Sequence, residues 1–237
     1  MDAVLDNPIW SSLRTRHRNI ARVKGTAARY PPDYAPFLGV ARADDDVEGA
    51  LASLVAPDQS VLLIGIAPGV SPAWRLERLE TLAQMVCTTP VRAMDGPEIV
   101  ALGAADRADV LALTALVYPH YFRRRTMELG QYFGVYRDGR LAAMAGERMG
   151  TDVYTELSAI CTHPDFTGRG YAHRLIAFLT RDVLARGLTP FLHVSYANPH
   201  AKSLYEDLGY RLRRELPFWS LRRDGRVSLL GTRSPRT

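Results

Sequence analysis

The segment Thr167-Gly168-Arg169-Gly170-Tyr171-Ala172 is the most informative stretch of this 237-residue chain. It follows His163-Pro164, where an apolar strand pattern ends, and it leads into a long helical pattern. The apolar residues of that pattern are three and four apart and predict one buried helix face: Ala172, Leu175, Ile176, Leu179, Val183 and Leu184. Arg186-Gly187 suits the helix end, because a cation favours the C-terminus and Gly turns freely.

A glycine-rich entry into a helix favours an anion. The first backbone N–H groups and the helix dipole together bind groups such as a diphosphate. Gly168 and Gly170 have no Cβ, so the backbone can approach phosphates closely. Alone, the pattern is equally typical of a tight turn. The dinucleotide fingerprint does not fit, since His173 stands at its third glycine, and no Gly-Lys-Ser/Thr of a P-loop follows.

Composition excludes several classes of protein. The chain is 47% hydrophobic and 23% charged, as soluble globular proteins are. The net charge of +5 is mild and scattered, which favours small anionic ligands and predicts no nucleic-acid partner. Without an apolar run of about 18 residues or the apolar centre of a signal peptide, we expect a cytoplasmic protein with no membrane partner. Cys87 and Cys161 lie far apart outside any CxxC motif, which predicts no metal site.

The first hundred residues show no chemical constellation. Residues 9–24 suggest a helix, residues 61–66 a buried strand, and residues 74–86 an amphipathic helix. Asp95-Gly96-Pro97 punctuates the chain, so we place a domain boundary there. The expected units are an N-terminal α/β domain over 1–97 and a second domain over 98–237.

The second half begins with a meander. A strand near 99–102 and a helix over about 106–117 precede Asp138-Gly139, which suits the positive φ angles of a type I′ hairpin turn. Strands are expected on both sides of that turn and again over 153–162. A further strand is expected over 190–196.

This order of elements resembles the GNAT superfamily of N-acetyltransferases. The matching segments are 157–166, which runs into the glycine loop, and 198–210, and the resemblance covers about 103–223. It looks closest to the branch that holds glycine N-acyltransferase-like enzymes. It implies an α/β (α+β) fold with a mixed, mostly antiparallel central sheet flanked by helices. The additional N-terminal domain would be a degenerate copy of this fold or a lid on the acceptor side.

The resemblance also implies the cofactor and its contacts. Acetyl-CoA would be the co-substrate, with its diphosphate on the loop of Thr167, Gly168, Arg169, Gly170, Tyr171 and Ala172. The family loop usually begins with Arg or Gln, so Thr167 is a departure that weakens the expected CoA affinity. The pantetheine would pair with the backbone of Ile160, Cys161 and Thr162, where an N–H polarises the thioester carbonyl. Asn198 would contact the pantetheine arm.

Tyr205 is the predicted general acid. Asn198 and Pro199 suit a helix start, and Tyr205 lies on the apolar face of the short helix that follows. Spacing alone favours a core aromatic residue there. The resemblance instead implies that Tyr205 protonates the departing CoA thiolate.

The general base is a separate question. Glu156 is the candidate, on the strand face that alternation would give to Ser158, Ile160 and Thr162, though an ordinary exposed Glu fits equally. Glu147 is the second choice, and His193 is more typical of a satisfied core histidine. Cys161 is expected to be buried rather than nucleophilic.

The predicted activity is transfer of an acetyl group to a primary amine, of a small molecule or a peptide, by direct attack in a ternary complex. A non-catalytic acyl-CoA-binding or regulatory module is the alternative, and a nucleic-acid-binding protein ranks last. The protein would be a monomer or homodimer. Acceptor-binding elements are expected at Tyr118, Tyr121 and Phe122, where the run 123–125 of three Arg could recognise an acidic acceptor.

Overall fold

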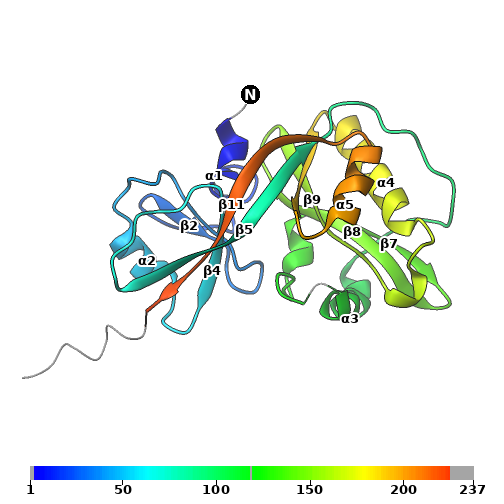
Figure 1. The fold of residues 1–237 in the computed structure, drawn as a ribbon. Coiled ribbons are helices and arrows are strands. Elements are labelled where there is room, and N and C mark those ends of the chain that lie inside the picture. Colours follow the sequence, from blue (N-terminus) through cyan, green and yellow to red (C-terminus); the bar gives the residue numbers. More distant parts are fainter. Residues whose placement is uncertain (1–2, 118, 225–237) are drawn as a thin grey trace, which may run out of the picture.

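The computed structural model describes residues 3–117 and 119–224, which form two β-sheets with helices packed on them (Figure 1). The small sheet has the order β1-β2-β3: β1 (Arg22–Lys24), β2 (Ala27–Arg29) and β3 (Leu38–Val40). The helices are α1 (Pro8–Arg14), α2 (Glu48–Leu54), α3 (Arg107–Val117), α4 (Tyr171–Ala185) and α5 (Pro199–Asp207). Short 3₁₀ turns are η1 (Ala3–Asp6), η2 (Ala104–Asp106), η3 (Thr126–Leu129) and η4 (Pro164–Phe166).

The large sheet has the strand order β4-β11-β5-β10-β9-β8-β7-β6. Its strands are β4 (Ser60–Ile64), β5 (Trp74–Val86), β6 (Val100–Ala101), β7 (Tyr132–Arg137), β8 (Arg140–Gly150), β9 (Tyr154–Thr162), β10 (Thr189–Ser195) and β11 (Arg211–Arg223). Neighbouring strands are antiparallel except β9 and β10, which are parallel. The predicted mixed, mostly antiparallel sheet flanked by helices is confirmed.

Helices cover both faces of this sheet, because successive side chains of a strand point to opposite faces. On β8, Ala143 and Ala145 belong to the core that holds Leu175 and Leu179 of α4. Met144, between them, packs in a separate cluster with Val110 of α3. In Figure 1, α4 accordingly lies above β7 and β8, and α3 lies below them.

The predicted hairpin is present. Asp138 and Gly139 both have positive φ angles, 52° and 72°, between β7 and β8. Such angles match the right-handed twist of the two strands, and Gly adopts them without steric cost. Residues 151–153 make the second reversal into β9, so the expected meander is confirmed.

The segment 74–86 is a strand, and the predicted amphipathic helix is wrong. β5 pairs along its length with β11 and, over its last residues, with β10. Leu79, expected on the buried helix face, is 50% exposed. The leucine spacing mimicked a helix, but two partner strands satisfy the backbone hydrogen bonds of β5, and such tertiary pairing overrides local pattern. The helix expected over 9–24 is also shorter, because α1 ends at Arg14 and β1 follows.

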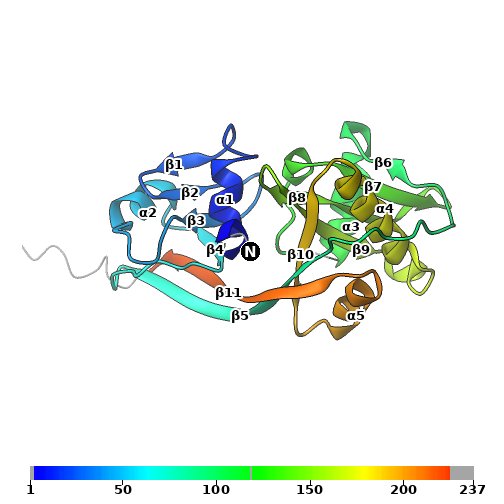
Figure 2. The same cartoon turned by 90° about the horizontal axis from the view of Figure 1, so that it is seen from above.

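Elements α1, α2 and β1 to β4 gather at one end of the molecule, and β5 and β11 run from that end toward β10 and α5 (Figure 2). β5 therefore lies inside the large sheet, between two strands of the second part of the chain. Helix α1 also contacts that part, since its Ser12 hydroxyl accepts from the N–H of Gly150 on β8 at 3.1 Å. Arg16, just after the helix, forms a 2.5 Å ion pair with Glu147 of β8. A domain boundary at residue 97 remains a prediction. Such a boundary would separate β5 in sequence from β10 and β11, the strands that it pairs with.

Candidate active site

The glycine loop has the conformation that anion binding requires. Gly168 and Gly170 have φ angles of +74° and +73°, and a Cβ at either position would meet open space. Gly170 precedes the first residue of α4 without a side-chain cap, so the first N–H groups of this 15-residue helix lack intrahelical partners. The Thr167 hydroxyl donates to the Pro164 carbonyl at 3.0 Å, which holds the loop in place. A diphosphate fits a loop of this kind.

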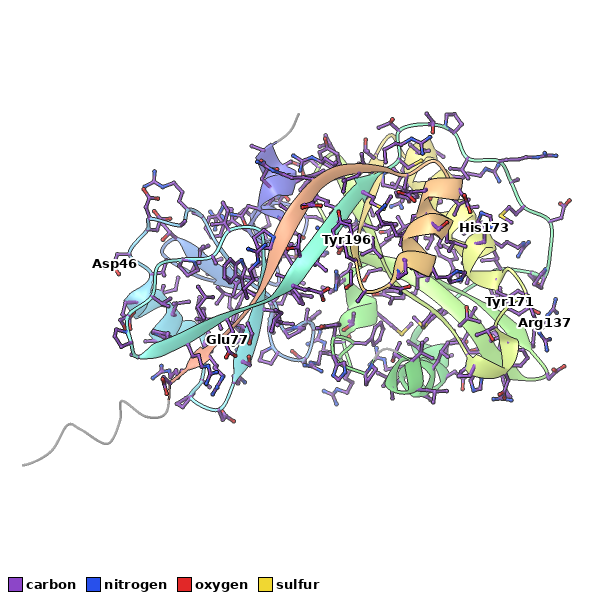
Figure 3. All side chains as sticks on the ribbon, viewed as in Figure 1. Asp46, Glu77, Arg137, Tyr171, His173 and Tyr196 are labelled. Atoms are coloured by element: carbon purple, nitrogen blue, oxygen red, sulfur yellow. The ribbon has the colours of Figure 1, made fainter. Side chains whose placement is uncertain are left out.

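Cations surround this helix start. The Nε of Arg137, at the end of β7, donates to the hydroxyl of Tyr171 at 3.3 Å. This hydrogen bond, together with one from Arg169, lowers the pKa of the Tyr171 hydroxyl. Figure 3 shows Arg137 and Tyr171 together beside the beginning of α4, with His173 nearby. The positive charge of Arg137 adds to the helix dipole. Arg137 was not among the residues predicted from the sequence to bind the cofactor.

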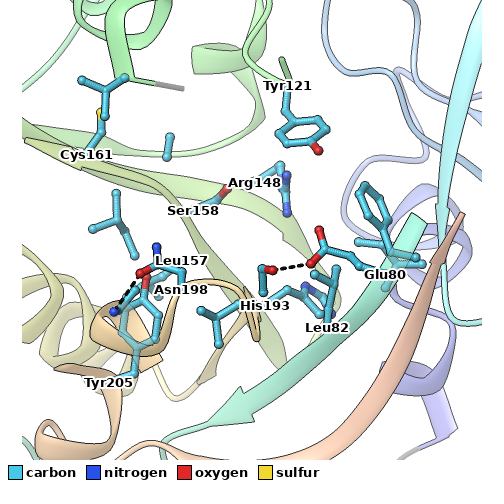
Figure 4. Close-up of a pocket in the computed structure, with 18 of the residues that line it drawn as sticks. Glu80, Leu82, Tyr121, Arg148, Leu157, Ser158, Cys161, His193, Asn198 and Tyr205 are labelled. Carbon is cyan, nitrogen blue, oxygen red and sulfur yellow. Dashed lines mark hydrogen bonds between the residues drawn. The ribbon is translucent and has the colours of Figure 1, made fainter. Parts of the chain in front are cut away.

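A cavity of about 310 Å³ lies where β9 and β10 separate. The parallel pairing of these strands covers three residue pairs and ends at Phe191 and Glu156 within the described residues. Beyond that point the strands diverge, and both line the cavity together with residues of β5 and α5 (Figure 4). The polar and aromatic lining residues are Phe37, Glu80, Tyr121, Arg148, Ser158, His193, Ser195, Asn198, Tyr205 and Phe218.

A β-bulge shapes the wall that β9 provides. Ala159 has a φ of 51°, and the register with β8 shifts between the pairs Met144–Cys161 and Gly146–Ser158. Such a bulge adds a residue to one strand and breaks the alternation of side chains. Five consecutive residues, 157–161, therefore line the cavity, and backbone groups at the bulge leave the ladder. An N–H group released in this way can polarise a carbonyl bound in the cavity.

Four residues that the sequence predicts to be functional meet at this cavity: Ile160, Cys161, Asn198 and Tyr205. The Asn198 side chain accepts from the Ala201 N–H at 3.1 Å, which is the predicted N-cap of α5. Tyr205 is 7% exposed, and its ring centroid lies 6.1 Å from that of Tyr210. Thr162 does not line the cavity but pairs with Ala143 of β8.

Glu156 is buried in an ion pair and does not line the cavity. Arg148 donates to both carboxylate oxygens, at 2.9 and 2.8 Å, and His193 Nδ1 lies 2.7 Å from Oε1. Burial alone raises the pKa of Glu156, but Arg148 and His193 outweigh it and lower the pKa to about 2. With both oxygens occupied, Glu156 is not placed to take a proton directly from an amine. The bulge at Ala159 lies beyond Ser158 and leaves the shared face of Glu156 and Ser158 unchanged. Glu156 does not reach the cavity because Arg148 and His193, which line it, bind its carboxylate.

The other two candidates for the general base, Glu147 and His193, also have polar partners for their side chains. Glu147 is fully buried on the opposite side of β8, where it pairs with Arg16 and Arg186. His193 contacts Glu156 through Nδ1 and the Gln84 side-chain nitrogen through Nε2, at 3.0 Å. Arg213 donates to Gln84 Oε1 at 2.8 Å, so Gln84 presents an N–H to His193. His193 is therefore a satisfied histidine, as its pattern indicated.

Cys161 is a buried thiol rather than a nucleophile. It is 5% exposed, and burial raises its pKa to about 12. A nucleophilic cysteine needs a thiolate. Its thiol therefore remains protonated at neutral pH, as expected from the sequence.

The residues after α3 that were expected to bind the acceptor lie in different environments. Tyr121 lines the cavity, and Phe122 packs edge-on against Tyr132 at 5.8 Å. Arg125 pairs with Glu128 at 2.7 Å, so this member of the Arg run stabilises its own turn. Tyr118 lies outside the described residues.

Sequence reasoning missed Glu80 and Arg148. Glu80 lies on β5, which had been interpreted as a helix. The period-two pattern of a strand, which gives Glu80 and Leu82 one face, was the signal that could have found it. Arg148 could not be predicted because its position depends on an ion pair with Glu156, which lies on the neighbouring strand β9.

Comparison with known proteins agrees with this architecture. Residues 132–219 match the family described as FR47-like protein. A crystal structure from Novosphingobium aromaticivorans, assigned to the GNAT acetyltransferase family, has 38% identity and a TM-score of 0.86 and covers 94% of this chain and 100% of that chain. A comparison with curated proteins gives no match.

Two more distant structures share the fold. A GCN5-related N-acetyltransferase from Kribbella flavida has 15% identity and a TM-score of 0.61, over 89% of this chain and 92% of that chain. A GCN5-related N-acetyltransferase-like protein from Streptococcus suis has 15% identity and a TM-score of 0.53, over 84% and 85%. In residues 3–117 and 119–224, no helix is long and apolar enough to cross a membrane, and no group of three His, Cys, Asp or Glu could hold a metal.

Proposed function

Because the chain belongs to the GNAT family of acetyltransferases, we propose that it transfers an acetyl group from acetyl-CoA to a primary amine. The observation that carries this proposal is the cavity between the diverging strands, where Tyr205, Asn198 and the β9 bulge face one space. The amine attacks the thioester carbonyl directly in a ternary complex. The carbon–sulfur bond breaks, an amide forms, and coenzyme A leaves as the thiol.

In this proposal the cofactor spans the two features of the site. The loop 167–172 and Arg137 hold its diphosphate, and the pantetheine runs along β9 past Ile160 and Cys161 toward the bulge. Asn198 contacts the arm from the other wall. A backbone N–H near the bulge stabilises the oxyanion, and the Tyr205 hydroxyl gives its proton to the departing sulfur. The attacking amine loses its proton to water.

Glu156 is then a positioning residue rather than the base. Its carboxylate fixes the guanidinium of Arg148 and the ring of His193, and both of these line the cavity. Loss of the carboxylate would therefore disturb the cavity wall without removing a group that touches the substrate. Thr162 belongs to the ladder with β8 and supports the bulge from its C-terminal side.

The test is release of CoA thiol from acetyl-CoA across a panel of amines, amino acids and peptides, with wild-type protein and Tyr205→Phe. We expect Tyr205→Phe to lower kcat by roughly 100-fold, because an acid that protonates the leaving group contributes about this factor, and to leave the Kd of acetyl-CoA nearly unchanged. An unchanged kcat removes Tyr205 from the mechanism.

The same panel separates an enzyme from a binding module. A non-catalytic acyl-CoA-binding protein would be stabilised by acetyl-CoA against thermal unfolding but would release thiol at the background rate with every amine. That result would contradict the proposed transfer while leaving the cofactor site intact.

A further inference from the structure

The cavity carries one carboxylate without a counter-charge. Arg148 also lines it, but its charge is matched by the buried Glu156. His193 contacts the Gln84 side-chain nitrogen through Nε2 and Glu156 through Nδ1, so both of its ring nitrogens have partners. Glu80 lines the same space and has no ion pair among the described residues. Glu80 therefore adds a negative charge to this end of the cavity, beside an Arg148 guanidinium that is already paired with Glu156.

Glu80 is held in a fixed orientation. The hydroxyl of Ser195 on β10 donates to Glu80 Oε2, and the Ala197 N–H donates to that hydroxyl at 3.1 Å. The two strands bring these residues together, because Ser195 is in register with Leu82, two residues from Glu80. Both donors are neutral, so the network orients the carboxylate while leaving its charge in place.

Aromatic residues line the same cavity as this carboxylate. The rings of Tyr121 and Phe218 meet edge-on at 6.1 Å, and the ring of Phe37 has the Arg148 guanidinium over it, 4.7 Å from its centroid. Burial raises the pKa of the Tyr121 hydroxyl, the negative charge of Glu80 raises it further, and the positive charge of Arg148 lowers it in part. A carboxylate beside aromatic rings is suited to an organic cation, since ring faces also attract positive charge.

Glu80 lies away from the acyl-transfer end of the cavity. In Figure 4, Tyr205 and Cys161 lie at the left and Glu80 lies at the right, with Arg148 and His193 between them. A cation bound at Glu80 is thus a different group from the amine that attacks beside Tyr205.

We propose that Glu80 is a specificity-determining residue that selects acceptors carrying a second positive charge, such as diamines or basic amino acids. This inference rests on the proposed acyl transfer and adds the class of acceptor to it. Glu80 binds the distal ammonium or guanidinium group and thereby places the reactive amine toward Tyr205. It also reverses the expectation of an acidic acceptor, because a carboxylate on the acceptor would face Glu80.

The experiment compares three acceptors of equal length at saturating acetyl-CoA: a linear diamine, the corresponding monoamine and the corresponding amino acid ending in a carboxylate. The wild-type protein should prefer the diamine over the monoamine by roughly tenfold in kcat/KM, the size expected for one partly buried charge pair. Glu80→Gln should remove this preference through KM, with monoamine turnover within about twofold of wild type. Glu80→Asp should retain part of it.

Glu77→Gln is the matched control, since Glu77 lies on the same strand but pairs with Arg75 at the surface. It should leave every ratio unchanged. If Glu80→Gln lowers kcat equally for all three acceptors and abolishes the acid limb of the pH profile, Glu80 is a general base and the inference is wrong. An unchanged diamine preference would also overturn it.

Failure of the proposed acyl transfer gives a different result. If no amine of the panel releases thiol, titration calorimetry of the diamine into the protein saturated with CoA still tests Glu80. Binding that weakens roughly tenfold in Glu80→Gln supports the cation site. Equal binding of diamine and monoamine, or no diamine binding, contradicts it.

Discussion

Replacing Glu156 by Gln tests whether the buried ion pair holds the cavity wall together. The pKa of the carboxyl is lowered from 4.5 to about 2, and one pKa unit corresponds to about 1.4 kcal/mol, so the folded environment as a whole stabilises the charged form by about 3 kcal/mol. Glu156 is fully buried, and the side chain of Arg148 is 10% exposed, so solvent screens the pair little. The variant leaves Arg148 buried without its counter-charge, and we expect a loss of about 3 kcal/mol in the free energy of unfolding at pH 7.

The sign of the pH dependence follows from the same shift. A carboxyl whose pKa is lower in the folded state stabilises the fold above its unfolded pKa, and this stabilisation disappears as pH falls through the folded pKa. The contribution is therefore complete above about pH 5.5, and about 1 kcal/mol of it is lost by pH 3.5. The difference between wild type and Glu156→Gln should shrink accordingly.

Urea unfolding followed by tryptophan fluorescence at pH 7 and at pH 3.5 measures both effects. Glu77→Gln, which breaks an exposed pair with Arg75, should cost less than about 0.5 kcal/mol at either pH. A loss below about 1 kcal/mol at pH 7, or a difference between the proteins that stays constant with pH, would refute the assigned role of the ion pair.

Two further predictions concern the cofactor loop and the thiol. Gly170→Val should weaken acetyl-CoA binding at least about tenfold by calorimetry, because Val is strained at a φ of +73° and its side chain would crowd the phosphates; normal affinity in a folded variant would contradict the placement of the diphosphate. Cys161→Ala should keep kcat within about threefold of wild type, because a thiol with a pKa of about 12 is not the nucleophile; a 100-fold loss, about 2.7 kcal/mol in the barrier, would restore it as a candidate.

Local signals predicted the second half of the chain well. The Asp138-Gly139 turn, the glycine loop and the Asn198 cap depend on residues adjacent in sequence, and the structure has each of them. The GNAT resemblance rested on these features and is confirmed, while the finer branch remains a prediction. The cavity residues Asn198 and Tyr205 followed from the same short motif.

Long-range contacts account for what the sequence could not predict. β5 has a helix-like leucine spacing, and its strand conformation depends on β10 and β11, which follow it by a hundred residues or more. The bulge at Ala159 gave no glycine signal, so alternation could not give the faces of Ile160 and Thr162. The burial of Glu156 depends on Arg148 and His193, which belong to other strands. Glu80 lines the cavity because β5 is a strand, which brings its carboxylate to Ser195 of β10.

The position of β5 also bears on how the chain is made. The ribosome completes β5 about a hundred residues before β10 and β11, which supply its two neighbours. During that interval both edges of a 13-residue strand carry unpaired backbone groups, a recognised route to aggregation. The cavity cannot close until β10 emerges, and the sheet is finished only with the last strand. We therefore expect nascent chains that stop before β11 to depend on chaperones, whereas the finished protein would not.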